Sequence, residues 1–333
     1  MKAMVLAAGR GERMRPLTDH FAKPLLPIAN RPVMGYILSH LARHGFTEVV
    51  ANLCYQAREI EACFGDGEAY GVHLSYSREE QLWGSAGSVK RNESFFTGEP
   101  FLVIGADDLT DMDLSALRRR HGEAGAMASI GLVEVAETSQ FGIVVTDGQG
   151  RIQRFVEKPQ GEAPSNTANT QIYLFASRLH DLIPAGEWYD FGFNVFPALV
   201  ATDEPFYGFA LPGYWRDIGS LEDYLAAQWD VLEGRVAADV PGTQVRPGVW
   251  MGEGCEIHPE AKLVAPLVLG DGCRVGAKAV LSGATAVASG VEVPAGTTLW
   301  NCVLWPGAKV PAGEEIRHAV LAADGIITRL VED

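Results

Sequence analysis

The sequence predicts an α/β fold with a mixed, mostly parallel sheet, followed by a C-terminal parallel β-helix. Two observations support this prediction. In the first two-thirds of the 333 residues, short apolar runs alternate with segments of helical periodicity. This βαβ rhythm is typical of a parallel sheet that is covered by helices. From about Pro241, aliphatic residues recur at every sixth position, which is the period of a parallel β-helix.

The expected strands and helices follow in order along the first part. Residues 2–6 form a short apolar run that leads directly into a glycine turn. The other expected strands are 48–53, 101–104, 128–133 and 142–146, and the expected helices are 33–43, 114–121 and 221–232. Ser220, with Asp223 three residues later, is a capping pattern for the last of these helices. The ligands of such a Rossmann-like sheet lie beyond the carboxyl ends of its strands.

The C-terminal repeat is carried by nine aliphatic residues that lie six apart without a break. They are Met251, Ile257, Leu263, Leu269, Val275, Leu281, Val287, Val293 and Leu299. If half of all residues counted as apolar, nine in register would arise by chance roughly once in 500 trials. Repeats of this kind stack one aliphatic side chain per short strand toward the inside. After Leu299 the register slips, because Val310 comes one residue early.

The charge balance limits the classes of partner. The net charge is −15, from 27 basic and 42 acidic residues, which argues against broad binding of nucleic acids or anionic membranes, because both need a basic face. No apolar run approaches the roughly 20 residues that span a bilayer, and the N-terminus lacks the longer apolar core of a signal peptide. The five cysteines are widely spaced and suggest reduced thiols. We therefore expect a cytoplasmic protein that binds any phosphorylated substrate through a few local cations or a metal.

The segment LAAGRGERMRP at residues 6–16 follows the first strand directly. Glycine lets backbone N–H groups approach an anion closely, although a merely structural turn would look the same. Met14 stands where a dinucleotide fingerprint needs its third glycine, and the Gly-Lys-Ser/Thr of a P-loop is missing. Arg13, Arg15 and Lys23 are three cations on a proline-stiffened segment. They are suited to a triphosphate cradle, and a solvated basic loop is the alternative.

These motifs together resemble the sugar-1-phosphate nucleotidyltransferases, also called NDP-sugar pyrophosphorylases. LAAGRGERMRPLT followed by KPLLPIANRP is similar to the family's signature. The resemblance continues in order through WGSAGSV at 83–89, FLVIGADDLTD at 101–111, FVEKP at 155–159, NTQIYLF at 169–175 and YWRDIGSLEDY at 214–224. One branch, which includes mannose-1-phosphate guanylyltransferases and long glucose-1-phosphate thymidylyltransferases, also has a six-residue repeat, in a left-handed β-helix. The resemblance implies a nucleotidyltransferase domain at 1–235, a linker at 236–247 and a hexapeptide-repeat domain at 248–333.

The resemblance implies that a nucleoside triphosphate and a sugar 1-phosphate react to give a nucleotide sugar and pyrophosphate. It places Arg13 and Lys23 on the triphosphate, with Arg13 steadying the pyrophosphate that leaves. Gly84 and Ser85 help to enclose the base, with Glu80 or Gln81 nearby. The full set of implied nucleotide-binding residues is Leu6, Ala7, Ala8, Gly9, Gly11, Arg13, Lys23, Gln81, Gly84, Ser85 and Asp107.

Two aspartates, Asp107 and Asp217, are the implied magnesium ligands. Mg²⁺ prefers one or two carboxylates together with substrate phosphates and water, so this pair suffices. Lys158 is assigned to the phosphate of the sugar, and Glu157 to its ring hydroxyls. The implied sugar-phosphate site consists of Gly142, Glu157, Lys158, Asn169 and Asp217. The implied catalytic set consists of Arg13, Lys23, Asp107, Lys158 and Asp217.

Three positions depart from the family pattern. Ala106 and Gln171 replace glycines, and Glu12 replaces the usual threonine of the nucleotide loop. If the glycine at 106 requires φ > 0, alanine costs about 1 kcal/mol there or shifts Asp107. These departures leave the sugar open. They also keep an alternative, a catalytically silent regulatory homologue that binds a nucleotide sugar.

The β-helix tail has two further interpretations. An acyltransferase would use a histidine between coils, but His258 and His318 are the only histidines there and neither lies on a long loop. We therefore expect the tail to be a structural module through which the protein forms a homo-oligomer. Trp250, Trp300 and Trp305 are suited to such a contact, and a rim of the β-helix core is the alternative.

Overall fold

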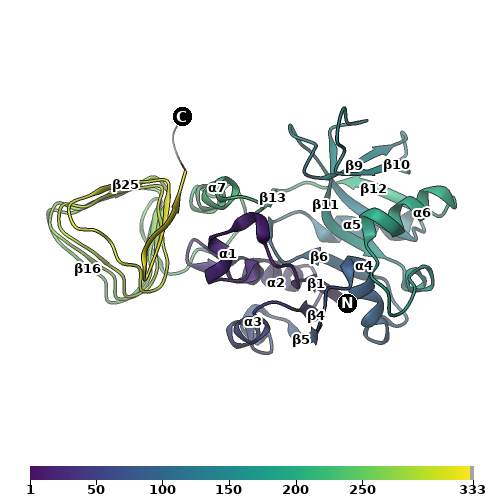
Figure 1. The fold of residues 1–333 in the computed structure, drawn as a ribbon, viewed down its shortest axis with the longest axis horizontal. Coiled ribbons are helices and arrows are strands. Elements are labelled where there is room, and N and C mark those ends of the chain that lie inside the picture. Colours follow the sequence, from purple (N-terminus) through teal and green to yellow (C-terminus); the bar gives the residue numbers. More distant parts are fainter. Residues whose placement is uncertain (331–333) are drawn as a thin grey trace. The chain divides into compact units, whose positions relative to one another are not determined.

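The computed structural model of the protein describes residues 1–330 (Figure 1). It divides into two compact units. The first comprises Met1–Gly9 and Ile37–Trp215, and the second comprises Arg10–Tyr36 and the chain from Arg216 onward. The glycine-rich loop is therefore divided between the units after Gly9. No helix of residues 1–330 combines the length and the apolar character that crossing a membrane requires.

The first unit is built around a mixed sheet of nine strands. Its path runs β10-β9-β11-β6-β1-β4-β5, with β8 paired to β11 and β12 paired to β8. The strands are β1 (Lys2–Leu6), β4 (Glu48–Leu53), β5 (His73–Arg78), β6 (Phe101–Gly105), β8 (Ala128–Glu134), β9 (Gly142–Thr146), β10 (Ile152–Glu157), β11 (Thr167–Phe175) and β12 (Phe206–Ala210). The neighbours β6, β1, β4 and β5 are parallel, whereas β11 is antiparallel to β6 and β8. The central strands are continuous apolar runs because both faces are covered.

Helices surround this sheet and fix the ends of its strands. They are α2 (Val33–Arg43), α3 (Ala57–Phe64), α4 (Gly84–Arg91), α5 (Leu114–Glu123) and α6 (Phe196–Ala201), with a π-helical turn at Phe191–Val195. The turn before α6 is held by stacked aromatic rings, since Phe191 lies 4.8 Å from Phe175 and 5.7 Å from Phe196 between ring centroids. This aromatic packing joins the turn to β11 and so fixes Asp190, the residue that precedes the turn.

The second unit begins with short elements and one long helix. They are 3₁₀ turns at Glu12–Met14 and Lys23–Leu25, α1 (Leu17–His20), β2 (Pro27–Ile28), β3 (Arg31–Pro32) and α7 (Leu221–Leu232). The short strand β13 (Trp215–Asp217) spans the boundary between the units, and another short strand, β7 (Asp108–Thr110), belongs to the first unit. The Ser220 hydroxyl accepts a hydrogen bond of 3.1 Å from the backbone N–H of Asp223, which confirms the predicted cap of α7.

The rest of the second unit is a parallel β-helix, whose coils appear in Figure 1 as stacked triangles in light green to yellow. Its strands form three sheets. They are β14 (Thr243–Arg246), β15 (Val249–Met251), β16 (Glu256–Ile257), β17 (Lys262–Leu263), β18 (Leu267–Leu269), β19 (Arg274–Val275), β20 (Val280–Ser282), β21 (Thr285–Val287), β22 (Glu292–Val293), β23 (Thr298–Trp300), β24 (Val303–Leu304), β25 (Glu315–Arg317), β26 (Ala319–Ala322) and β27 (Gly325–Arg329).

The pairing register explains the six-residue period and its slip. Val249 pairs with Leu267, 18 positions later, so three six-residue repeats make one coil. Ala286 pairs with Val303, only 17 positions later. The later coils are thus one residue shorter, as the early Val310 indicates. All nine periodic aliphatic residues lie in or against the core of the β-helix.

The fold predicted from the sequence is confirmed, and most of the expected elements lie where the pattern placed them. The bounds agree for residues 2–6, 33–43, 48–53, 142–146 and 221–232, and three others extend one or two residues further. The sequence analysis identified FVEKP and NTQIYLF only as motifs, but they lie on or at the end of β10 and β11. It did not predict the strands β5 and β12.

Candidate active site

A pair of acidic side chains in the first unit lies where β10 ends. A Cβ added to Gly192 would lie 2.6 Å from Glu157 Oε2 and 3.4 Å from Asp190 Oδ1, and one added to Gly142 would lie 2.8 Å from the same Glu157 oxygen. Burial raises the pKa of Glu157, Lys158 lowers it, and Asp190 raises it. The Lys158 ammonium lies 3.7 Å from Glu157 Oε1. The structure thus brings Gly142, Glu157 and Lys158 together, which are three residues of the predicted sugar site.

Asp190 is a candidate residue that the sequence analysis missed. Its carboxylate accepts a hydrogen bond of 2.8 Å from the Ser85 hydroxyl, which in turn accepts one from the Phe191 N–H. Gly84 packs on the same segment, since a Cβ there would lie only 2.4 Å from the Tyr189 carbonyl oxygen. Asp190 also caps the π-helical turn. An acidic residue just before FGFNV is a capping signal that would have marked it.

Asn169 belongs to the same region. Its amide donates a hydrogen bond of 2.9 Å to the Tyr173 hydroxyl and accepts one from the Gln171 N–H. Burial raises the pKa of Tyr173, and the nearby carboxylates of Asp190 and Glu157 raise it further. Gln171 itself has φ of +58°, in the left-handed region that favours glycine. Position 171, where glutamine replaces the family's glycine, is therefore under backbone strain in this chain.

Asp107 lies just after β6, beside a second aspartate. A Cβ added to Gly105 would lie 3.2 Å from Asp107 Oδ1 and 2.4 Å from Asp108 Oδ2, so glycine is required for this approach. Asp108 is fully buried. Ala106 donates its N–H to the Leu6 carbonyl and is not among the described residues with positive φ. The backbone strain that a positive φ would cause at Ala106 is therefore absent.

The first half of the glycine-rich loop is fixed by a buried polar network. The Ala7 N–H donates a hydrogen bond of 2.9 Å to the Asn52 side-chain oxygen, and the Asn52 amide donates to Glu79 and Ser88. Burial raises the pKa of Glu79. Gln81 is exposed and stays a prediction. The sequence analysis missed Asn52 and Glu79, although Asn52 lies near the carboxyl end of β4, where ligands are expected.

The second half of the loop lies in the other unit, against Lys23. Gly11 has φ of +65°, and a Cβ there would lie 2.7 Å from Thr18 Cγ2 and 2.9 Å from Lys23 Cγ. The Thr18 hydroxyl donates a hydrogen bond of 2.8 Å to the Gly11 carbonyl. Glycine at 11 thus lets the Lys23 stem pack over the turn. Arg15 forms an exposed ion pair with Asp19 at 3.3 Å.

Arg13 and Asp217 meet in the second unit although they are far apart in the sequence. A Cβ added to Gly219 would lie 3.1 Å from Asp217 Oδ2 and 3.6 Å from Arg13 Nη1. Any side chain at 219 would therefore crowd both groups. The guanidinium offers positive charge to an anion and the carboxylate offers oxygen ligands to a metal ion, so the pair suits both anion binding and metal binding.

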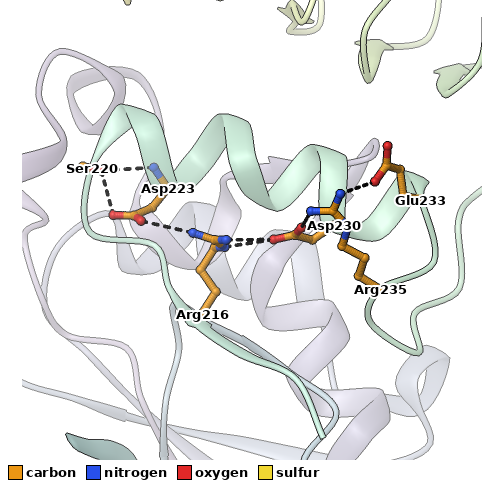
Figure 2. A network of polar contacts seen from close by, with 6 residues as sticks. All are labelled: Arg216, Ser220, Asp223, Asp230, Glu233 and Arg235. Carbon is orange, nitrogen blue, oxygen red and sulfur yellow. Dashed lines mark hydrogen bonds and ion pairs between the residues drawn. The ribbon is translucent and has the colours of Figure 1, made fainter. Parts of the chain in front are cut away.

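The residue before Asp217 is tied to helix α7 by ion pairs. Figure 2 shows the Arg216 guanidinium between two carboxylates of α7, Asp223 and Asp230. The distances are 3.4 Å to Asp223 Oδ1 and 3.0 Å to Asp230 Oδ2. Asp230 also accepts a hydrogen bond of 3.0 Å from Arg235. This network holds β13, and with it the backbone of Asp217, on the helix.

The two candidate magnesium ligands belong to different units, Asp107 to the first and Asp217 to the second. Within residues 1–330 there is no group of three or more histidine, cysteine, aspartate or glutamate side chains that could hold a metal ion. An ion bound by one or two carboxylates, with phosphates and water completing the octahedron, does not need such a group. The donor types fit Mg²⁺.

Comparison with known proteins identifies the family of the chain. Residues 2–234 match the family model described as Nucleotidyl transferase. The chain therefore belongs to the nucleotidyl transferase family. A UTP–glucose-1-phosphate uridylyltransferase of Synechocystis sp. is 41% identical over 267 residues, which cover 76% of this chain and 69% of the relative.

Two further proteins extend the comparison. A mannose-1-phosphate guanylyltransferase of Mycobacterium tuberculosis is 33% identical over 313 residues, which cover 93% of this chain and 81% of the relative. A solved structure from Bacillus anthracis, assigned as a glucose-1-phosphate thymidylyltransferase in complex with a sucrose, superimposes with a TM-score of 0.62 at 23% identity. It covers 68% of this chain and 93% of its own, and at that identity it supports the fold alone.

Proposed function

We propose that the protein condenses a nucleoside triphosphate with a sugar 1-phosphate to give a nucleotide sugar and pyrophosphate. An oxygen of the sugar phosphate attacks the α-phosphorus, and the bond from the α-phosphorus to its bridging oxygen breaks, so pyrophosphate leaves with the electron pair. No protein nucleophile is required, because positioning and charge compensation suffice. The observation that carries the proposal is the meeting of Arg13 and Asp217 at Gly219. It supports the proposal because the cation that we assign to pyrophosphate lies beside a candidate metal ligand.

The triphosphate is assigned to the glycine-rich loop and its cations, Arg13 and Lys23. Gly9 supports this assignment, because it is exposed and a Cβ there would meet nothing within 4 Å. Nothing in the packing of the described chain explains a glycine at 9, whereas a close approach of phosphate to the backbone does. The remaining proposed nucleotide contacts are Leu6, Ala7, Ala8, Gly11, Gln81, Gly84, Ser85 and Asp107.

The sugar 1-phosphate is assigned to the cluster around Glu157. The half-exposed Lys158 ammonium suits the phosphate, and Glu157 suits ring hydroxyls as a hydrogen-bond acceptor. We add Asp190 to this set because its carboxylate lies beside that of Glu157. Asn169 and Gly142 complete the proposed sugar site, with Asp217 toward the phosphate.

Mg²⁺ is proposed as the cofactor, with Asp107 and Asp217 as its protein ligands. When bound, the ion supplies positive charge that stabilises the charge developing on the phosphate oxygens. The aspartates hold the ion in place, while Arg13 and Lys23 neutralise the leaving pyrophosphate. The chain's own contribution is therefore a fixed arrangement of charges.

The test is release of pyrophosphate, measured with a panel of triphosphates and sugar 1-phosphates. We expect Asp107→Ala to lower kcat at least ~10³-fold, about 4 kcal/mol, with little effect on the fold. Asp324→Ala, an exposed aspartate between β26 and β27, is the matched control and should leave kcat unchanged. Near-normal turnover in Asp107→Ala would remove Asp107 from the metal site.

The base and the sugar stay open, because the named relatives differ in both. A thermal-shift screen of uridine, guanosine, thymidine and adenosine triphosphates with Mg²⁺ identifies the base, since a ligand of the native state raises the unfolding midpoint. The same screen with glucose, mannose and N-acetylated sugar 1-phosphates identifies the sugar. No observation favours the catalytically silent alternative.

Three further assignments remain proposals. The domain boundaries are 1–235, 236–247 and 248–333, and the location is cytoplasmic. The protein forms a homo-oligomer through its β-helix. Within the described chain, the sheets β16-β19-β22 and β17-β20-β23-β25 end without the antiparallel strands that bound the third sheet, and open strand edges favour pairing. Sedimentation analysis of the whole chain tests the oligomer, and a monomer would contradict it.

A further inference from the structure

Trp305 is buried within the second unit and does not lie on an exposed rim of the β-helix. It follows β24, and its indole N–H donates a hydrogen bond of 3.0 Å to the Tyr224 hydroxyl on α7. That hydroxyl donates its own proton to the Pro27 carbonyl at 2.8 Å. Two hydrogen bonds in series therefore join the β-helix, helix α7 and the segment Arg10–Tyr36, which is called the basic segment below.

The indole also contacts the basic segment through its ring. Its centroid lies 4.8 Å from that of Phe21 at an interplanar angle of 82°, and 5.9 Å from that of His20 at 65°. These are edge-to-face contacts, which aromatic rings prefer. Phe21 is two residues before Lys23. Trp305 is thus in contact with the chain directly before the Lys23 turn.

A second anchor lies directly after that turn, in the hairpin of β2 and β3. Its turn residues Ala29 and Asn30 have φ of 44° and 64°, as a type I′ turn requires. The Asn30 amide donates a hydrogen bond of 2.8 Å to the Val287 carbonyl of β21. The Ala29 N–H donates to the buried Gln228 of α7 at 2.7 Å, and the Gln228 amide donates to the Pro27 carbonyl.

The two anchors lie on either side of Lys23, whose stem packs on Gly11. We propose that Trp305 is a positioning residue: through Tyr224 and Phe21, the β-helix holds the basic segment in the arrangement that presents Lys23 and Arg13 to a triphosphate. The inference rests on the proposed function of those cations. It assigns the β-helix a role in substrate binding within one chain, separate from any role in oligomerisation.

The test uses conservative variants of the full-length protein. Trp305→Phe keeps a ring but removes the indole donor, and Asn30→Gly removes the amide while keeping the turn, because glycine suits its positive φ. Each variant should raise KM for the triphosphate about three- to tenfold, because the binding-competent segment is populated less, and leave KM for the sugar 1-phosphate unchanged. Trp250→Phe, an indole of β15 in the same β-helix, is the control and should change neither.

Hydrogen exchange of the amides at 20–30 gives a readout that does not depend on activity. We expect faster exchange there in Trp305→Phe and Asn30→Gly than in the parent protein, with the Trp250→Phe control unchanged. Faster exchange in a protein that binds no triphosphate would overturn the proposed function and still support the anchoring. Unchanged exchange and unchanged triphosphate KM in both variants, or an equal rise of both KM values, would overturn the positioning role.

Discussion

The ion pairs that Arg216 forms with Asp223 and Asp230 are tested most directly by replacing Asp230. Its carboxylate is only 3% exposed and pairs with Arg216 and Arg235, each at 3.0 Å. Asp230→Ala removes both pairs. Arg235 is 59% exposed and regains water, so its loss costs little. Arg216 is 31% exposed and keeps its longer contact with Asp223 at 3.4 Å. Most of the cost arises at Arg216, because it is less exposed than Arg235.

The expected loss in the free energy of unfolding follows from the different exposure of Arg216 and Arg235. A hydrogen bond to a charged group is worth about 1.5–3 kcal/mol when buried, and removing one partner of a buried pair costs up to about 5 kcal/mol. Because Arg216 is partly exposed, water screens its charge. We therefore expect Asp230→Ala to lower the free energy of unfolding by about 2–3 kcal/mol. Because Arg216 precedes Asp217, the Mg²⁺ concentration for half-maximal rate should also rise.

The assay is urea unfolding followed by a magnesium titration of the rate. Glu233→Ala is the matched control, because Glu233 pairs with the exposed Arg235 and is itself 33% exposed. Its loss should change the free energy of unfolding by less than about 0.5 kcal/mol. If Asp230→Ala unfolds at the same urea concentration as Glu233→Ala, the network does not hold β13 and the reasoning is wrong.

Four other perturbations have defined outcomes. Burial lowers the pKa of His40 and of His121 from 6.5 to about 4. As the pH falls, these histidines are therefore protonated in the unfolded chain before they are protonated in the folded one. The free energy of unfolding should decrease between about pH 6.5 and 4, by roughly 3 kcal/mol for each histidine. Urea midpoints that do not change between pH 7.5 and 4.5 would contradict this. Gln171→Gly should raise the free energy of unfolding by about 1 kcal/mol, because φ is +58° there; a lower thermal midpoint would argue against strain. Gly84→Ala should destabilise by at least about 2 kcal/mol, since its Cβ would lie 2.4 Å from a carbonyl oxygen. Gly9→Ala, with open space around it, should leave stability within about 0.5 kcal/mol and weaken only triphosphate binding.

The β-helix could be predicted well because its signal is local and repeated. Each inward aliphatic residue is set by its own six-residue segment, and the neighbouring coil reinforces it. Even the 17-residue coils are visible in the sequence, through the early Val310. The Ser220 cap and helix α7 were predicted for the same reason, since a helix start depends on residues within one turn.

The acidic residues of the candidate site could not be placed in this way. The sequence analysis placed Glu80 or Gln81 near the base, but the carboxylate linked to Ala7 is that of Glu79. The link runs through the side chain of Asn52, which is 27 residues before Glu79. Asp190 lies beside Glu157 only because glycines at 142 and 192 make room for the carboxylates. These are close approaches between distant segments, and a single sequence carries no periodic signal for them.

The division of the chain into units also sorts the candidate residues into two sets. Asp107, Glu157 and Lys158 belong to the sheet, whereas Arg13, Lys23 and Asp217 belong to the unit that contains the β-helix. Each set has one of the two candidate magnesium ligands, so loss of either aspartate should weaken the binding of Mg²⁺. The cations differ, because Lys158 is assigned to the sugar phosphate and Arg13 and Lys23 to the triphosphate. Substitutions that displace Arg13 or Lys23 should therefore act on triphosphate binding first. The role proposed for Trp305 follows the same division, because Trp305 and these two cations belong to one unit.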